Sequence, residues 1–180
     1  IRPGHVVIYG RTGSGKTNTA KLLASVLSRH VPVLVLDWAG EYEIEGFRRM
    51  KPGEDLRINP LEYVTGELSE HIDFLVDLFG DTFDFTEPQR MFREALKRAF
   101  SESAVPTIAD LLDALQRVPP RSYYDHEIKA AIRRRLTQLA EGRIGRAFSH
   151  THVNLSGLFE ENVVVDLSAF RSVHSSCLLY

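Results

Sequence analysis

A glycine-rich loop follows directly on an apolar run near the amino end of the chain and constrains the fold more than any other feature. The loop is Gly10-Arg11-Thr12-Gly13-Ser14-Gly15-Lys16-Thr17, and the apolar run is Val6-Val7-Ile8-Tyr9. A strand, a glycine turn and a helix in this order form a phosphate-binding loop, whose unhindered backbone N–H groups point at a phosphate. The positive end of the helix dipole is added at the same place. The chain is therefore expected to bind a nucleoside triphosphate.

The side chains of this loop have separate predicted tasks. Lys16 is expected to reach the β- and γ-phosphates, and the Thr17 hydroxyl to ligate Mg²⁺. The predicted nucleotide-binding residues are Gly13, Ser14, Gly15, Lys16, Thr17 and Asn18. The alternative is a glycine turn that binds no ligand. The predicted strand before the loop and helix after it make this alternative less favourable.

Alternating strands and helices predict an α/β fold. Apolar runs at 6–10 and 33–37 read as buried strands, and a third strand is expected at 163–167. The first two strands and the helix from 15 to about 29 make a right-handed βαβ unit, with 33–37 as a central parallel strand. The expected inner face of the helix consists of Leu22, Leu23, Val26 and Leu27.

The middle of the chain predicts four helices between the second and the last strand. The first covers 67–79 and ends at Gly80, and the second is capped by Thr86 and runs to about residue 100. Thr107 and Ser122 cap the third and fourth helices. We expect a single domain over residues 1–180 in which about 67–148 form a helical insertion.

Composition excludes several classes of protein. The chain has 180 residues, of which 43% are hydrophobic and 26% charged, as expected for a globular domain with a substantial core. Its single cysteine, Cys177, excludes an internal disulfide framework and reads as a small buried apolar residue. No apolar stretch approaches the roughly 20 residues of a membrane span. The net charge of −2 neither indicates nor excludes nucleic-acid binding.

Two acids follow the second predicted strand. Asp37 ends the strand, at the edge where α/β sheets place their ligand chemistry, and could hold Mg²⁺ or orient a water molecule. Its alternative role is a helix cap or a loop ion pair. Glu41 could act as a general base towards water at the γ-phosphate. Its alternative role is that of a solvated surface residue.

Three segments resemble the HerA–FtsK superfamily of ring ATPases. They are Asp37-Trp38-Ala39-Gly40-Glu41-Tyr42, Asn59-Pro60-Leu61 and Val163-Val164-Val165-Asp166-Leu167-Ser168. The resemblance implies a RecA-like P-loop NTPase fold with a mostly parallel sheet, ATP and Mg²⁺ as cofactors, and Lys16, Asp37 and Glu41 as catalytic residues, with Thr17 and Asp37 holding the metal. It also implies a cytoplasmic hexamer that moves on double-stranded DNA as a translocase or helicase, grips DNA with pore loops and works with a nuclease.

One part of the family pattern is missing. The second acid motif of such ATPases is an apolar run ending in Asp-Glu, but Leu167 follows Asp166 here. Either the chain is a fragment that stops before this motif, one helix beyond Tyr180, or Asp166 is itself the acid on the magnesium side. The first explanation predicts that this chain binds nucleotide and hydrolyses it poorly.

Basic residues that could contact phosphates fall in two places. Candidates for an arginine finger are Arg133, Arg134, Arg135, Arg143 and Arg146, although a solvated helix face is the favoured explanation for any single one of them. Arg48, Arg49 and Lys51 are candidates for DNA contact in a loop after Glu41, where an ordinary surface loop is the alternative.

Two other functions remain open. A VirB4-type conjugation or secretion ATPase would keep the fold and move protein or nucleoprotein. A regulatory module would bind nucleotide without hydrolysing it.

Overall fold

The computed structural model describes residues 4–63, 66–83, 89–150 and 156–168. These residues form two compact units, which are described separately. The sheet unit holds the described residues up to Lys51 and from 156 to 168, and the helical unit holds those from Pro52 to 150. The insertion expected at about 67–148 falls within the helical unit. The grouping of residues 1–180 into a single domain stays a prediction.

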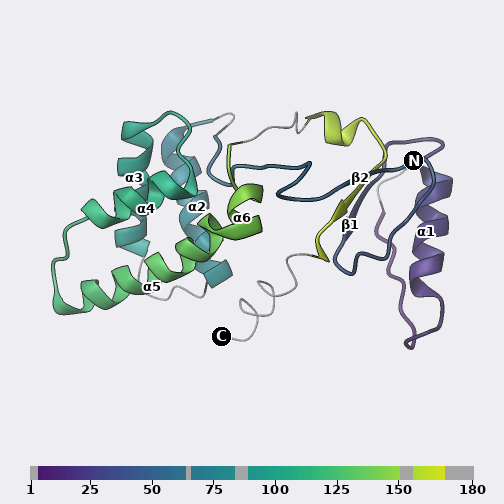
Figure 1. Ribbon diagram of the computed structural model, residues 1–180, viewed down its shortest axis with the longest axis horizontal. Helices are drawn as coiled ribbons and strands as arrows, with labels where there is room; N and C mark the ends of the chain where they lie inside the picture. Colours follow the sequence, from purple (N-terminus) through teal and green to yellow (C-terminus); the bar gives the residue numbers. More distant parts are fainter. Residues whose placement is uncertain (1–3, 64–65, 84–88, 151–155, 169–180) are drawn as a thin grey trace. The chain divides into compact units, whose positions relative to one another are not determined.

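The sheet unit is built on three parallel strands (Figure 1). These are β1 (Leu34–Asp37), β2 (Arg48–Met50) and β3 (Val163–Asp166), in the order β1-β3-β2. The helix α1 (Lys16–Leu27) stands beside the sheet, and the short 3₁₀ helix η1 (Ser156–Phe159) precedes β3. All four residues of β3 are buried, as is typical of the central strand of a parallel sheet. Asp37 and Asp166 are paired in register, so both acids end their strands at one edge.

The expected strand at 6–10 is wrong. Residues 4–11 have no regular secondary structure, and the exposed fractions of Val6 and Tyr9 are 80% and 91%. A strand forms only where its N–H and C=O groups find a neighbouring strand. Among the described residues, β1, β3 and β2 pair only with one another. The apolar run is therefore unpaired, and the predicted βαβ unit lacks its first strand here.

Two expectations about burial in the sheet unit are also wrong. The expected inner face of α1 is exposed, with Leu22 at 66%, and Ala24 is the buried residue of this helix. The segment 33–37 supplies β1, which is an edge strand and not a central one, and Leu36 is 58% exposed. Helical spacing of apolar residues identifies a face, but burial needs an element packed against that face. Among the described residues, no such element covers it.

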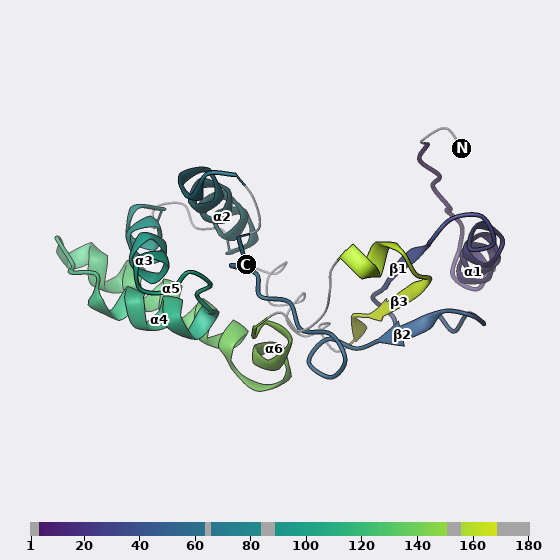
Figure 2. The same ribbon diagram turned by 90° about the horizontal axis from the view of Figure 1, so that it is seen from above.

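The helical unit contains five helices among its described residues (Figure 2). They are α2 (Leu68–Phe83), α3 (Gln89–Glu102), α4 (Ile108–Arg117), α5 (Tyr123–Ala140) and α6 (Gly142–Ala147). Successive helices pack against one another and enclose an apolar core. The largest fully buried side chains of this core include Leu75, Phe92, Leu96, Leu111 and Leu136. None of the described helices is both long enough and apolar enough to cross a membrane.

Local caps set two of the helix boundaries. The Thr107 hydroxyl accepts from the Asp110 amide, and the Asp110 carboxylate accepts from the Thr107 amide, which completes a capping box. The Ser122 hydroxyl accepts from the amide of Asp125 at the start of α5. Both predicted caps are therefore confirmed.

Other expectations about the helices have different outcomes. The expected stop at Gly80 is wrong, because α2 continues to Phe83, and α6 was not expected. A glycine can remain inside a helix when neighbouring apolar residues pack, at a cost of about 1 kcal/mol relative to alanine. Thr86 and Cys177 lie outside the described residues.

The Asn59-Pro60-Leu61 segment forms a buried turn at the start of the helical unit. The Asn59 side chain is 3% exposed; its Nδ2 donates to the Pro106 carbonyl at 2.9 Å and its Oδ1 accepts from the Leu61 amide at 3.1 Å. Leu61 is fully buried in the helical core. This segment therefore ties the chain entering the helical unit to the residues before α4.

Candidate nucleotide-binding site

The glycine-rich loop has the backbone shape that phosphate binding requires. Gly13 and Gly15 have φ of 81° and 88°, in the left-handed region that disfavours other residues. The Ser14 amide donates to the Arg11 carbonyl at 3.1 Å and closes a turn before α1. Gly15 is the N-cap of α1 and provides no side-chain cap. The first amides of the helix therefore face the loop without a side chain that competes with a phosphate.

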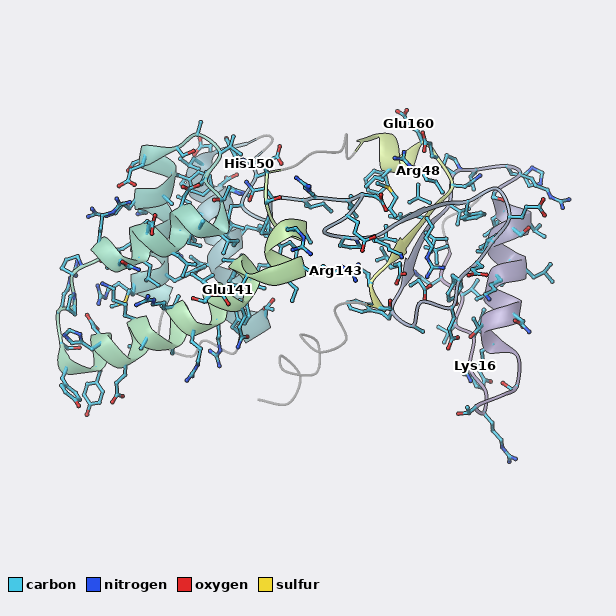
Figure 3. All side chains as sticks on the ribbon, viewed as in Figure 1. Lys16, Arg48, Glu141, Arg143, His150 and Glu160 are labelled. Atoms are coloured by element: carbon cyan, nitrogen blue, oxygen red, sulfur yellow. The ribbon has the colours of Figure 1, made fainter. Side chains whose placement is uncertain are left out.

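Lys16 lies at the loop end of α1 (Figure 3). Its Nζ donates to the Arg11 carbonyl at 2.8 Å, so the ammonium spans the loop on which phosphates would bind. A Cβ on Gly10 would lie 2.6 Å from the Ser14 Oγ, so a larger residue there would require the exposed Ser14 side chain to turn away. Asn18 is exposed in the first turn of α1, and its role in nucleotide binding stays a prediction.

The structure brings Thr17 and Glu41 together across 24 positions of sequence. The Thr17 hydroxyl donates to Glu41 Oε2 at 3.4 Å, which is long for a bond between two oxygens. Hydroxyl and carboxylate oxygens are the hard ligands that Mg²⁺ accepts, and Mg²⁺ normally takes one or two protein groups together with substrate phosphates. The Thr17 hydroxyl therefore fits a metal carried by a nucleotide, and the Glu41 carboxylate lies beside that hydroxyl. No cluster of three metal-binding side chains occurs in the described part of the chain.

Asp37 organises the turn that carries Glu41. Its carboxylate is 1% exposed and accepts three backbone amides. Oδ1 accepts from Ala39 at 3.2 Å and from Gly40 at 2.9 Å, and Oδ2 accepts from Tyr42 at 2.8 Å. Among the described residues, the hydrogen bonds that Asp37 accepts from this loop therefore come from backbone amides and not from a basic side chain. The proposed contact of Asp37 with the metal stays a prediction.

Asp166 lies beside Asp37 at the end of β3 and is 7% exposed. Its Oδ2 accepts from Arg49 Nη2 at 2.8 Å, and its Oδ1 accepts from the Ser168 amide at 3.0 Å. Burial raises its pKa, but hydrogen bonds from the Ser168 hydroxyl and from Arg49 outweigh this and lower the pKa from 3.8 to about 2. Asp166 is therefore ionised at neutral pH and paired with a cation.

Arg49 is the residue of this site that sequence reasoning missed. Its expected position in a loop, together with Arg48, is wrong, because both belong to β2. Arg48 pairs with Glu161 at 3.6 Å, and Arg49 pairs with Asp166 (Figure 3 labels Arg48). A three-residue strand of two arginines and a methionine has no apolar alternation, so only its long-range pairing with β3 identifies it.

The candidate arginine fingers fall in the helical unit. Arg133, Arg134 and Arg146 are exposed, and Arg143 on α6 forms an ion pair with Glu54 (Figure 3 labels Arg143). Arg135 is partly buried in α5. Any role for these residues in hydrolysis stays a prediction.

Residues 4–176 match the family described as helicase HerA, central domain. The chain belongs to this family. A curated relative, the DNA double-strand break repair helicase HerA of Sulfurisphaera tokodaii, is 32% identical over 103 residues. That match covers 55% of this chain and 19% of the relative.

A solved structure, VirB4 of Thermoanaerobacter pseudethanolicus, is similar in fold. The TM-score is 0.69 and the identity 20%, over 93% of this chain and 50% of the VirB4 chain. This likeness supports the P-loop NTPase fold that the glycine-rich loop predicts. The chain thus spans half or less of the length of both proteins.

Proposed function

We propose that this chain is the nucleotide-binding part of an ATP-hydrolysing motor of the HerA kind, which moves on double-stranded DNA. The observation that carries the proposal is the joint geometry of Lys16, Thr17 and Glu41 around the glycine-rich loop. Membership of the HerA family supports ATP and DNA as its ligands. As the resemblance to HerA-type ring ATPases implies, we also propose a cytoplasmic location, a homohexameric ring and a nuclease partner.

In the proposed reaction the loop amides and Lys16 bind the phosphates of ATP. The Lys16 ammonium leaves the Arg11 carbonyl and neutralises charge on the β- and γ-phosphate oxygens. A bound Mg²⁺, held by the Thr17 hydroxyl and with Asp37 as the further proposed ligand, would supply additional positive charge to those oxygens.

Glu41 is the proposed general base of the reaction. The oxygen of a water molecule bonds to the γ-phosphorus, and the bond from that phosphorus to the β,γ-bridging oxygen breaks. The proton lost by the water passes to the Glu41 carboxylate, and ADP and phosphate leave. Glu41 is exposed, so water can reach it.

The substitution Glu41→Gln tests this assignment, with Glu45→Gln as the matched control on an exposed glutamate of the same loop. Glu41→Gln should lower kcat for ATP by about 10²- to 10⁴-fold, the usual effect of a general base, and change KM little. Steady-state phosphate release measures both constants. Equal turnover in the two variants would contradict the role of Glu41.

A second candidate is a module that binds ATP without hydrolysing it. The favouring observation is that the Asp166 carboxylate is paired with Arg49 and followed by Leu167 where an Asp-Glu pair is expected. This candidate predicts tight ATP binding and no phosphate release, with DNA or without it. Turnover by the parent protein that Glu41→Gln abolishes would exclude it.

A further inference from the structure

One side chain, that of Arg49, links the turn that carries Glu41 to both β2 and β3. Arg49 Nη2 donates to the Gly40 carbonyl at 3.2 Å and to Asp166 Oδ2 at 2.8 Å. Gly40 directly precedes Glu41, and Arg49 comes from the far edge strand of the sheet, β2. The guanidinium therefore connects the proposed general base to the central strand.

We propose that Arg49 is a positioning residue for ATP hydrolysis, whose guanidinium holds the Gly40 carbonyl and thereby keeps Glu41 beside Thr17. The inference rests on the proposed function of the loop. The side-chain hydrogen bonds and ion pairs of Arg49 among the described residues are with Gly40, Asp166 and Glu43, so Arg49 acts on Glu41 through the backbone of the turn.

The turn is held from both sides. Asp37 accepts the Gly40 and Tyr42 amides, which fixes the N–H side of the turn. Arg49 binds the Gly40 carbonyl, which fixes the opposite side of the same residue. The carboxylate alone leaves that carbonyl free to rotate, so both contacts are needed to define the direction in which Glu41 leaves the turn.

Close packing makes this attachment stiff. Gly40 has φ of 73°, and a Cβ there would lie 3.1 Å from the Ser168 side chain and 3.6 Å from Asp166 Oδ1. The turn therefore lies directly on the residues that follow β3. A displacement of Arg49 or Asp166 is transmitted to Gly40 because little free space separates them.

Neutralising the charge of Asp166 does not by itself explain why an arginine occupies position 49, because its burial carries an energetic cost. Its Nε is buried and has no hydrogen-bond partner within the described part of the chain. A buried N–H without a partner is unfavourable and needs an explanation. The second contact of the guanidinium, with Gly40, supplies one. Arginine is a cation at neutral pH, and the hydrogen bond to Asp166 raises the pKa of Arg49 further.

Three variants test the inference by phosphate release without DNA, accompanied by urea unfolding. Arg49→Met should lower kcat by about 10- to 100-fold with KM for ATP changed less than about threefold, because misplacement of a catalytic group acts on turnover. Arg49→Lys keeps a cation opposite Asp166, but its nitrogen is one bond closer to the backbone. It should restore stability and leave kcat low. Arg48→Met, in the same strand with an exposed partner, should match the parent protein.

Hydrogen exchange of the Gly40 and Tyr42 amides gives a readout that does not depend on activity. Exchange at these amides should accelerate at least about tenfold in Arg49→Met and stay unchanged in Arg48→Met, because loss of the carbonyl contact frees the turn. Unchanged exchange, or full recovery of kcat in Arg49→Lys, would overturn the inference. If the parent protein releases no phosphate, the proposed function is contradicted. Hydrogen exchange in Arg49→Met then still tests whether Arg49 holds the turn.

Discussion

At the scale of single residues, the site depends on buried acids whose partners differ. Asp37 and Asp166 end neighbouring strands in register, yet Asp37 binds backbone amides and Asp166 binds a guanidinium. Two carboxylates placed so close would repel each other if each lacked a donor. Their different partners therefore explain how both acids can be buried at one edge of the sheet.

The low pKa of Asp166 predicts an acid-dependent loss of stability. A carboxyl whose pKa is lowered from 3.8 to about 2 on folding stabilises the folded state above the higher value, and this contribution disappears as the pH falls through the lower one. The difference in free energy of unfolding between the parent and Asp166→Asn should therefore be constant above about pH 5 and shrink between about pH 4 and pH 2. Urea unfolding at several pH values measures it. A difference that is independent of pH would contradict the pairing.

At the scale of elements, the features that the sequence predicts correctly are those that depend on interactions between neighbouring residues. Thr107 and Ser122 were identified as caps because a cap needs only neighbouring amides, and the glycine-rich loop was identified because its shape depends on its own glycines. The strand β2 was missed and the strand at 6–10 was wrongly expected. Both outcomes depend on pairing with segments far away in the chain, which periodicity does not encode.

Two glycines inside helices differ in the free space around them, which decides the expected effect of replacing each with alanine. A Cβ on Gly145 in α6 would lie 2.0 Å from the Ala140 carbonyl oxygen, whereas a Cβ on Gly80 in α2 meets nothing within 4 Å. Gly145→Ala should cost about 1–3 kcal/mol of stability through overpacking. Gly80→Ala, the matched control, should add about 0.5–1 kcal/mol through backbone entropy. Thermal and urea unfolding measure both changes, and equal effects would contradict the packing of α6 against α5.

At the scale of the whole molecule, the two candidate motors differ in their cargo, which is DNA in one and protein or nucleoprotein in the other. The HerA relative is described as a DNA repair helicase, whereas the likeness to VirB4 concerns the fold. The residues of the nucleotide loop are compatible with either cargo, because their proposed contacts are with the phosphates of ATP and not with the cargo. Only a response to the cargo itself separates the two motors.

Double-stranded DNA should therefore stimulate ATP hydrolysis if the chain works as proposed. The stimulation should weaken steeply between about 50 and 200 mM salt, because contacts to DNA phosphates release counterions. Phosphate release with and without duplex DNA at both salt concentrations measures it. If the rate of phosphate release is the same with and without DNA at both salt concentrations, the result would favour a protein or nucleoprotein cargo, as in a VirB4-type ATPase.

The central claim is that the glycine-rich loop and Lys16 hold the phosphates of ATP. Calorimetric titration with a non-hydrolysable ATP analogue and Mg²⁺ tests it most directly, with Lys16→Ala as the variant and Lys97→Ala, an exposed lysine of α3, as the control. Loss of a hydrogen bond from a charged group is worth about 1.5–3 kcal/mol, so Lys16→Ala should weaken binding by about 10- to 100-fold while the control binds like the parent. Equal affinity in all three proteins would contradict the account.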